Sequence, residues 1–184
     1  MKTPKDSPKM VDMALARIVI REGSDQQYIF LQEQGGGRGF PIVIGTSEAC
    51  EIRRVVAGLP TPRPLTHQLA FETIRALGTE LRHVDIVDLR DNTFFAQLVL
   101  HKQEGEVTAV VDARPSDAVA LALRARCPIR VAESVLDMVR TDPSGPDPLL
   151  PDPESSPGST SGPGTEGGGE GEKDDPNAEE DDDA

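Results

Sequence analysis

Four polar residues stand within six positions where an apolar segment gives way to a helix-like one: Asp112, Arg114, Ser116 and Asp117. The apolar residues before them predict a buried strand. Pro115 suits the first position of a helix, because proline has no N–H to leave unpaired there. Ser116 and Asp117 fit plain capping of the helix N-terminus, and capping is the favoured interpretation for Ser116. Asp112 with Arg114 fits a functional site as well as it fits a structural ion pair.

Four other residues with reactive side chains lie near the ends of predicted elements. Glu48 falls in the first turn of a helix predicted over residues 46–56, where it suits either the helix dipole or a metal. Arg63 and His67 stand where a stiff proline-rich segment leads into a second helix, and a helix N-terminus favours anions. Asp88 is predicted on the apolar face of a strand, where a carboxylate needs a partner or a metal.

Alternation of apolar and polar residues with period two predicts strands, and apolar spacing of three to four predicts helices. The predicted strands cover residues 14–21, 28–33, 40–44, 81–89, 93–101, 106–112 and 129–132. The predicted helices cover residues 46–56, 66–77, 115–126 and 133–140. The expected fold class is therefore α+β, a mainly antiparallel or mixed sheet with three to four packed helices. Exposed edge strands in such a sheet favour a homo-oligomer.

Charge is distributed unevenly along the chain. Residues 141–184 hold 14 of the 32 acidic residues and one of the 19 basic residues, so the formal net charge of −13 belongs to this segment. Pro, Gly and Ser fill most of the rest of it, and such a segment buries too little apolar surface to fold. The sequence predicts a disordered leader over residues 1–12, a domain over residues 13–140 and a disordered acidic tail over residues 141–184.

The cysteines and the apolar segments of the sequence indicate the cellular compartment of the protein. Cys50 and Cys127 form no CxxC motif, so we expect reduced thiols rather than a disulfide or a zinc site. We find neither a signal peptide nor an apolar run long enough to span a membrane. These features predict a cytoplasmic protein.

Several motifs in one order resemble the bifunctional nuclease (BFN) domain family. They are FPIVIG at residues 40–45 followed by Glu48, RPLTH at residues 63–67, VDLRDNTFFA at residues 87–96 and VDARPSDAVALA at residues 111–122. The resemblance covers residues 13–140, and the run DARPSDA is its most specific part. Asn92 stands where the family usually has glycine in a turn, and asparagine tolerates the same positive φ. The resemblance implies a nuclease that acts on both DNA and RNA.

The residues singled out above fit that chemistry. Carboxylates hold Mg²⁺ or Mn²⁺, and such an ion activates water and neutralises phosphate charge. The hypothesis makes Asp112, His67, Asp88 and Asp117 the catalytic residues, with His67 as general base or ligand. Its metal ligands are Glu48, Asp88 and Asp112. Its phosphate-binding residues are Arg63 and Arg114, since guanidinium groups bind phosphate oxygens in pairs.

A second hypothesis is a non-catalytic module that binds a small ligand or a protein. Without the acidic tail the chain is formally neutral, and a strong nucleic-acid binder usually shows a basic patch. In this interpretation the acids and arginines near residue 114 form an ion-pair network that joins strand to helix. Metal dependence separates the two hypotheses, because a divalent ion that binds the folded state raises its melting temperature.

Overall fold

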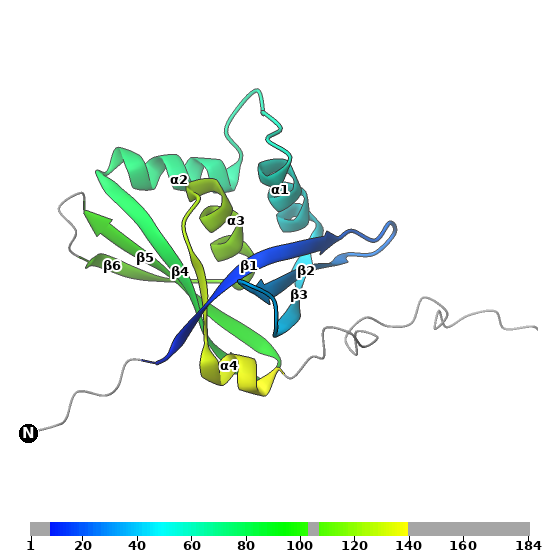
Figure 1. Ribbon diagram of the computed structural model, residues 1–184. Coiled ribbons are helices and arrows are strands. Elements are labelled where there is room, and N and C mark those ends of the chain that lie inside the picture. Colours follow the sequence, from blue (N-terminus) through cyan, green and yellow to red (C-terminus); the bar gives the residue numbers. More distant parts are fainter. Residues whose placement is uncertain (1–7, 103–106, 140–184) are drawn as a thin grey trace, which may run out of the picture. The chain divides into compact units, whose positions relative to one another are not determined.

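The computed structural model describes residues 8–102 and 107–139, which lie in one compact unit, Met1–Leu150 (Figure 1). The second unit, Pro151–Ala184, lies outside the described residues, as do the rest of the predicted acidic tail and residues 1–7. The first strand begins at Met10, so three residues assigned to the leader are strand residues.

The described residues form seven strands and four helices. The strands are β1 (Met10–Val19), β2 (Gln26–Glu33), β3 (Gly39–Gly45), β4 (Thr79–Arg90), β5 (Thr93–Lys102), β6 (Val107–Ala113) and β7 (Ile129–Ala132). The helices are α1 (Thr46–Val56), α2 (Thr66–Ala76), α3 (Pro115–Ala125) and α4 (Glu133–Met138). Every predicted element is present, with ends that differ by a few residues.

The seven strands form one sheet in the order β3-β2-β1-β7-β4-β5-β6. All neighbouring strands are antiparallel except β4 and β7, which are parallel. The α+β prediction with a mixed sheet is therefore confirmed. The short strand β7 joins the two antiparallel halves of the sheet, and β1 pairs with it only along Met10–Met13.

One face of the sheet packs against the helices and holds the core. Cross-strand partners place Val84, Leu98 and Ile129 on this face, since residues paired in register point the same way. Helix α3 contributes a run of fully buried residues to the same core, which explains its high alanine and valine content. Those residues are Ala118, Val119, Ala120 and Ala122.

Helices α1 and α3 are built by the same local pattern. Each follows directly from a strand, and the residue before the helix is extended: Gly45, the last residue of β3, before α1, and Arg114 before α3. In neither helix does a side chain cap the N-terminus, so the capping role favoured for Ser116 is not found. Ion pairs join α1 to α3, and Glu48 at the start of α1 contacts Arg114 at the start of α3.

The predicted hairpin turn between β4 and β5 is also found. Asp91 and Asn92 both have positive φ, 47° and 58°. This conformation is the one required at both central residues of a two-residue hairpin turn, and Asn and Asp adopt it more readily than other non-glycine residues. Asparagine is therefore compatible with the turn at the position where glycine is usual.

Two further predictions concern the thiols and the membrane. Cys50 and Cys127 are free and half-buried, and burial raises the pKa of the Cys127 thiol to about 11. Cys127 is therefore a poor nucleophile at neutral pH. Among the described residues, no helix is long and apolar enough to cross a bilayer.

Candidate functional site

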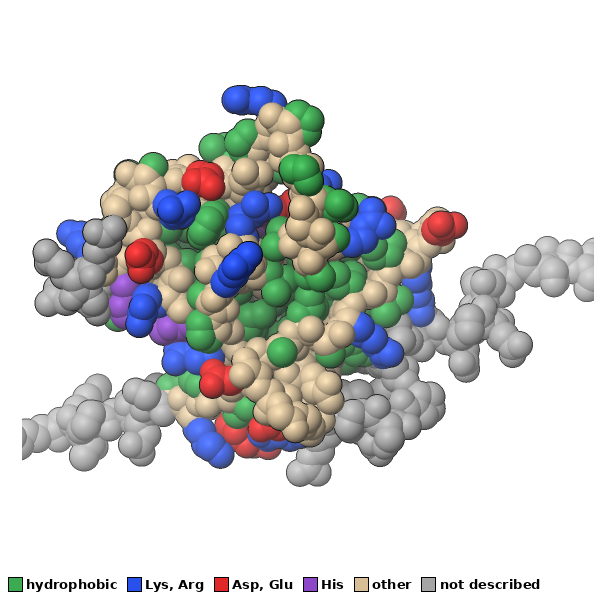
Figure 2. Space-filling model, turned by 45° about the horizontal axis from the view of Figure 1, so that its top comes forward, with side chains coloured by type: hydrophobic (Ala, Val, Ile, Leu, Met, Phe, Trp, Pro, Cys, Tyr) green, Lys and Arg blue, Asp and Glu red, His purple; other side chains and the backbone are tan. Residues whose placement is uncertain are grey.

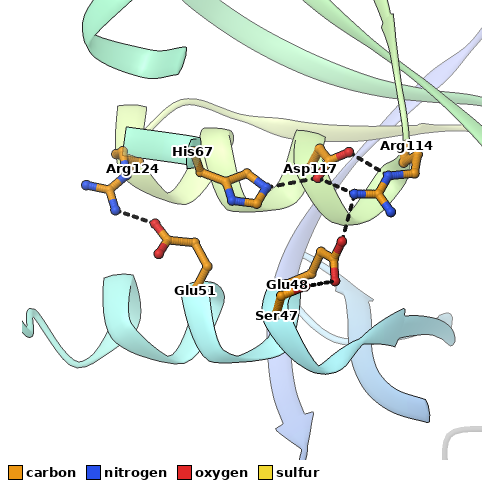
Figure 3. A network of polar contacts seen from close by, with 7 residues as sticks. All are labelled: Ser47, Glu48, Glu51, His67, Arg114, Asp117 and Arg124. Carbon is orange, nitrogen blue, oxygen red and sulfur yellow. Dashed lines mark hydrogen bonds and ion pairs between the residues drawn. The ribbon is translucent and has the colours of Figure 1, made fainter. Parts of the chain in front are cut away.

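Side chains from three helices meet around Arg114 (Figure 3). Glu48 comes from α1, His67 from α2 and Asp117 from α3. The Arg114 Nε–H donates to Asp117 Oδ2 at 2.8 Å, and Nη2 donates to Asp117 Oδ1 at 3.0 Å and to Glu48 Oε1 at 2.7 Å. His67 Nε2 lies 2.9 Å from Asp117 Oδ1. We call these four residues the Arg114 cluster.

The environment of Asp117 fixes the protonation of its histidine partner. Burial opposes ionisation of this carboxyl group, but hydrogen bonds from Arg114 and His67 outweigh burial and lower its pKa below the ordinary value. An ionised carboxylate only accepts hydrogen bonds, so the proton in the 2.9 Å contact belongs to His67 Nε2. In the neutral imidazole, Nδ1 then carries the free lone pair. This arrangement is that of a histidine base oriented by an aspartate.

Glu48 accepts from the same Arg114 nitrogen, Nη2, as Asp117 does. Burial disfavours its charge, but hydrogen bonds from the Ser47 hydroxyl, the Glu48 backbone N–H and Arg114 lower its pKa. The Ser47 Oγ–H donates to Glu48 Oε2 at 2.8 Å. Two carboxylates therefore restrain the guanidinium, and they raise its pKa. Even so, 67% of the Arg114 side chain is exposed, so the cation faces solvent on its remaining side.

Gly45 leaves the space that the Glu48 carboxylate occupies. A Cβ added at Gly45 would lie 2.5 Å from Glu48 Oε2. We expect Gly45→Ala to lower the free energy of unfolding by about 1–2 kcal/mol, because the carboxylate must leave its contacts with Ser47 and Arg114. Denaturant unfolding measures this value. In a Glu48→Ala background the same substitution meets no carboxylate, and an equal cost in both backgrounds would contradict the explanation.

A second set of contacts joins α1 to α3 beside the Arg114 cluster. Glu51 on α1 is almost fully buried, and its carboxylate contacts Arg124 on α3 (Figure 3). The same carboxylate accepts from Arg54 at 2.8 Å. These contacts hold α1 against α3 and so fix Glu48 relative to Asp117. Sequence reasoning missed Glu51, Arg124, Ser47 and Gly45. A glutamate beside the apolar stripe of α1 was the available signal for Glu51.

The structure places three predicted site residues away from the Arg114 cluster. Asp112 is exposed on β6 and pairs with Gln97, so it points to the face opposite its neighbour Ala113, which packs on the core. A β-bulge between Ile86 and Asp88 turns Asp88 to the other face, so its prediction on the apolar face is wrong.

Asp88 binds a different arginine from the one in the cluster. Its Oδ2 accepts from Arg90 at 2.6 Å, which lowers its pKa. Arg63 is exposed before α2, and among the described residues it has no hydrogen-bond or ion-pair partner. The structure thus unites Glu48, His67, Arg114 and Asp117 and separates them from Asp88 and Asp112.

The donor set does not fit a metal held by protein ligands alone. Within residues 8–102 and 107–139, no three or more His, Cys, Asp or Glu side chains gather as a metal site would require. Arginines bind two of the proposed ligands, Glu48 and Asp88. The proposed set of Glu48, Asp88 and Asp112 is therefore not assembled in this structure, and we derive no catalytic step through a metal.

Comparison with known proteins identifies the family of this chain. The sequence model of the bifunctional nuclease domain matches residues 29–144, which is more than half of the chain. The chain belongs to the bifunctional nuclease domain family. The matched residues include all four residues of the Arg114 cluster and the helices α1, α2 and α3.

Relatives of this BFN domain occur in bacteria and plants. An uncharacterized protein of Mycobacterium tuberculosis is 42% identical over 127 residues, which are 69% of this chain and 74% of that protein. Bifunctional nuclease 1 of Arabidopsis thaliana is 30% identical over 104 residues, 56% of this chain and 32% of the plant protein. Bifunctional nuclease 1 of Oryza sativa subsp. japonica is 26% identical over 132 residues, 68% of this chain and 40% of that protein.

Proposed function

We propose that this protein is a nuclease that hydrolyses phosphodiester bonds in DNA and RNA. One observation carries the proposal: His67, Asp117 and Arg114 form one hydrogen-bonded group, with a histidine base and an exposed guanidinium attached to the same carboxylate. Membership in the BFN domain family and the names of the plant relatives support it.

In the proposed reaction His67 is the general base. Its Nδ1 takes a proton from the attacking water, whose oxygen forms the new bond to phosphorus. Asp117 keeps the imidazole oriented and stabilises the imidazolium that results. The bond from phosphorus to the leaving oxygen breaks, and solvent protonates that oxygen.

Arg114 binds the phosphate in this proposal. Its Nη1 has no partner among the described residues, and Figure 3 shows this nitrogen without a dashed line. A guanidinium held rigidly by Glu48 and Asp117 stabilises the charge that develops on the phosphate oxygens. Arg63, exposed at the start of α2, is proposed to contact a flanking phosphate.

Binding should be modest and sensitive to salt. On the face shown in Figure 2, lysine and arginine side chains are dispersed among hydrophobic ones and form no continuous stripe. In the described part of the chain, seven arginines are paired with carboxylates, which compensate much of their positive charge. Few counterions are then released on binding, and affinity stays low.

The assay is cleavage of labelled single-stranded RNA and duplex DNA by the full-length chain. Each substrate is tested with EDTA, Mg²⁺ and Mn²⁺, beside an Arg114→Ala protein purified identically. Cleavage that the variant lacks supports the proposal. Equal cleavage by both proteins indicates a contaminating nuclease, and no cleavage by either contradicts the proposal.

The second candidate function is a non-catalytic binding module. It is favoured by the fact that every acid of the Arg114 cluster is paired and that the pairs join three helices. Such a network needs no substrate to explain it. Absent cleavage together with a normally folded protein supports this alternative.

The divalent metal predicted from the sequence has its own test in thermal denaturation. A metal bound by Glu48, Asp88 and Asp112 would raise the melting temperature by mass action. Because these carboxylates are apart and two are paired with arginine, we expect millimolar Mn²⁺ alone to leave the melting temperature unchanged. A rise that Glu48→Gln abolishes would contradict this expectation and restore the predicted ligand set.

A further inference from the structure

A pocket of about 750 Å³ opens beside Arg114. One wall is the edge strand β3, a second is the turn of the β4–β5 hairpin, and the start of α3 and the end of α4 complete it. Its lining residues include Val43, Phe94, Arg114 and Ser116. Arg114 is the only Arg or Lys among the described lining residues, and Asp25 is the only carboxylate.

Most of the pocket surface is apolar. Ile42 and Ile44 of β3 and Leu89 of β4 line it, and Phe94 adds an aromatic ring whose position is fixed by stacking on Phe40 at 5.2 Å. Such walls suit a flat, weakly polar group. The volume lies in the range of pockets for small molecules and exceeds what one phosphate group requires.

The end of the pocket at α3 is polar, and it includes backbone N–H groups that no side chain caps. No side chain caps α3, and the first backbone N–H bonded in this helix is that of Ala118, 3.0 Å from the Arg114 carbonyl oxygen. Ser116 is only 7% exposed, yet among the described residues its hydroxyl has no hydrogen-bond partner. Ser116 also lines the pocket, so its hydroxyl is available to hydrogen-bond a ligand there.

We propose that this pocket binds an unpaired nucleobase together with the phosphate next to it. The base lies against Phe94 and the apolar walls, and the phosphate contacts Arg114, the Ser116 hydroxyl and the free N–H groups of α3. This inference rests on the proposed nuclease function, and it names the substrate class. The preferred substrate is single-stranded or locally unpaired nucleic acid.

The preference follows from the cost of extracting a base. In a duplex the base is stacked and paired, and bringing it into a pocket requires flipping it out of the helix. An unpaired base needs no such step. We therefore expect single strands to be cleaved at least tenfold faster than the same sequence in a duplex.

The direct test is calorimetric binding of adenosine 5′-monophosphate and of inorganic phosphate to the full-length chain. Val43→Trp places a large side chain at the pocket, and Val107→Trp makes the same change on the other edge strand. The two valines are similarly exposed, 52% and 59%. We expect Val43→Trp to weaken nucleotide binding at least tenfold, Val107→Trp to change it less than twofold, and Ser116→Ala to weaken it several-fold.

Two results overturn the inference. One is nucleotide binding no tighter than that of inorganic phosphate. The other is equal nucleotide binding by the two tryptophan variants. Neither result depends on hydrolysis, so the nuclease proposal is judged separately by the loss of cleavage in Arg114→Ala. Cleavage of duplex and single strands at equal rates would reject the substrate preference while leaving the nuclease function intact.

Discussion

Replacing His67 by alanine is expected to lower kcat/KM for single-stranded RNA by a factor of about 10² to 10⁴. This range is the usual contribution of a positioned general base. The two carboxylates of the Arg114 cluster have lowered pKa values and are bound to arginine, so the imidazole is the candidate base. Initial rates at substrate concentrations below KM measure the effect.

Asp112→Ala is the matched control for that experiment. Asp112 lies five residues from Asp117 and was also predicted to be catalytic, but it is exposed on the opposite sheet face. We expect this variant to retain activity within about threefold, because it removes no contact with the Arg114 cluster. Loss of activity in Asp112→Ala together with retention in His67→Ala would reverse the assignment of the site.

Both variants must be shown to be folded before their rates are compared. His67 donates to a carboxylate that Arg114 also holds, so its loss leaves Asp117 paired. We expect a change of about 1 kcal/mol in unfolding free energy, the usual value for one hydrogen bond. Circular dichroism and the denaturation midpoint provide this check.

Glu51→Gln is expected to lower the free energy of unfolding by about 3 kcal/mol, the cost of breaking a buried ion pair from one side. Only 4% of the Glu51 side chain is exposed, and its carboxylate contacts both Arg54 and Arg124. The substitution leaves Arg124 facing a neutral amide between α1 and α3. Urea denaturation measures the change.

Glu72→Gln on α2 is the control for the effect of burial. Glu72 and Arg75 have the same i, i+3 spacing as Glu51 and Arg54, but they are exposed and 3.8 Å apart. An exposed pair contributes at most about 1 kcal/mol. Equal losses in the two variants would show that burial of Glu51 does not determine its contribution.

The pH dependence follows from the direction of the pKa shift at Glu51. Burial raises the pKa of Glu51, but the hydrogen bonds and positive charges of Arg124 and Arg54 lower it by a larger amount. The pKa of Glu51 in the folded state therefore lies below its value in the unfolded state. The stabilisation is complete above the unfolded pKa, about 4.3, and is lost as pH falls through the folded-state value. Glu51→Gln should therefore flatten the loss of stability below about pH 5.

Local sequence patterns identified the residues of the Arg114 cluster but not their contacts. Glu48, His67 and Asp117 lie in the first turns of three helices, and proline, threonine and alternating apolar residues mark those turns in the sequence. Their pairing joins positions 50 and 66 residues apart. Such contacts depend on how the helices pack, which no local pattern encodes.

Asp88 and Asp112 show two different reasons why the sequence-based prediction of the site was incomplete. Strict alternation placed Asp88 on the apolar face, and the bulge after Ile86 reversed its direction without a glycine to signal it. For Asp112 the signal was present, because alternation with the core residue Ala113 already directs its side chain to the other face. The catalytic prediction for Asp112 rested on its position at the end of a strand and ignored the direction in which its side chain points.

The order of strands in the sheet has a consequence for biosynthesis. The halves β3-β2-β1 and β4-β5-β6 each consist of strands consecutive in the chain, whereas β7, which joins them, is the last strand of the described domain. During translation each half can form its own hairpins as it emerges, but the ribosome must release residues 129–132 before the halves are united. A chain that stops before Ile129 would contain both halves and lack the strand that connects them.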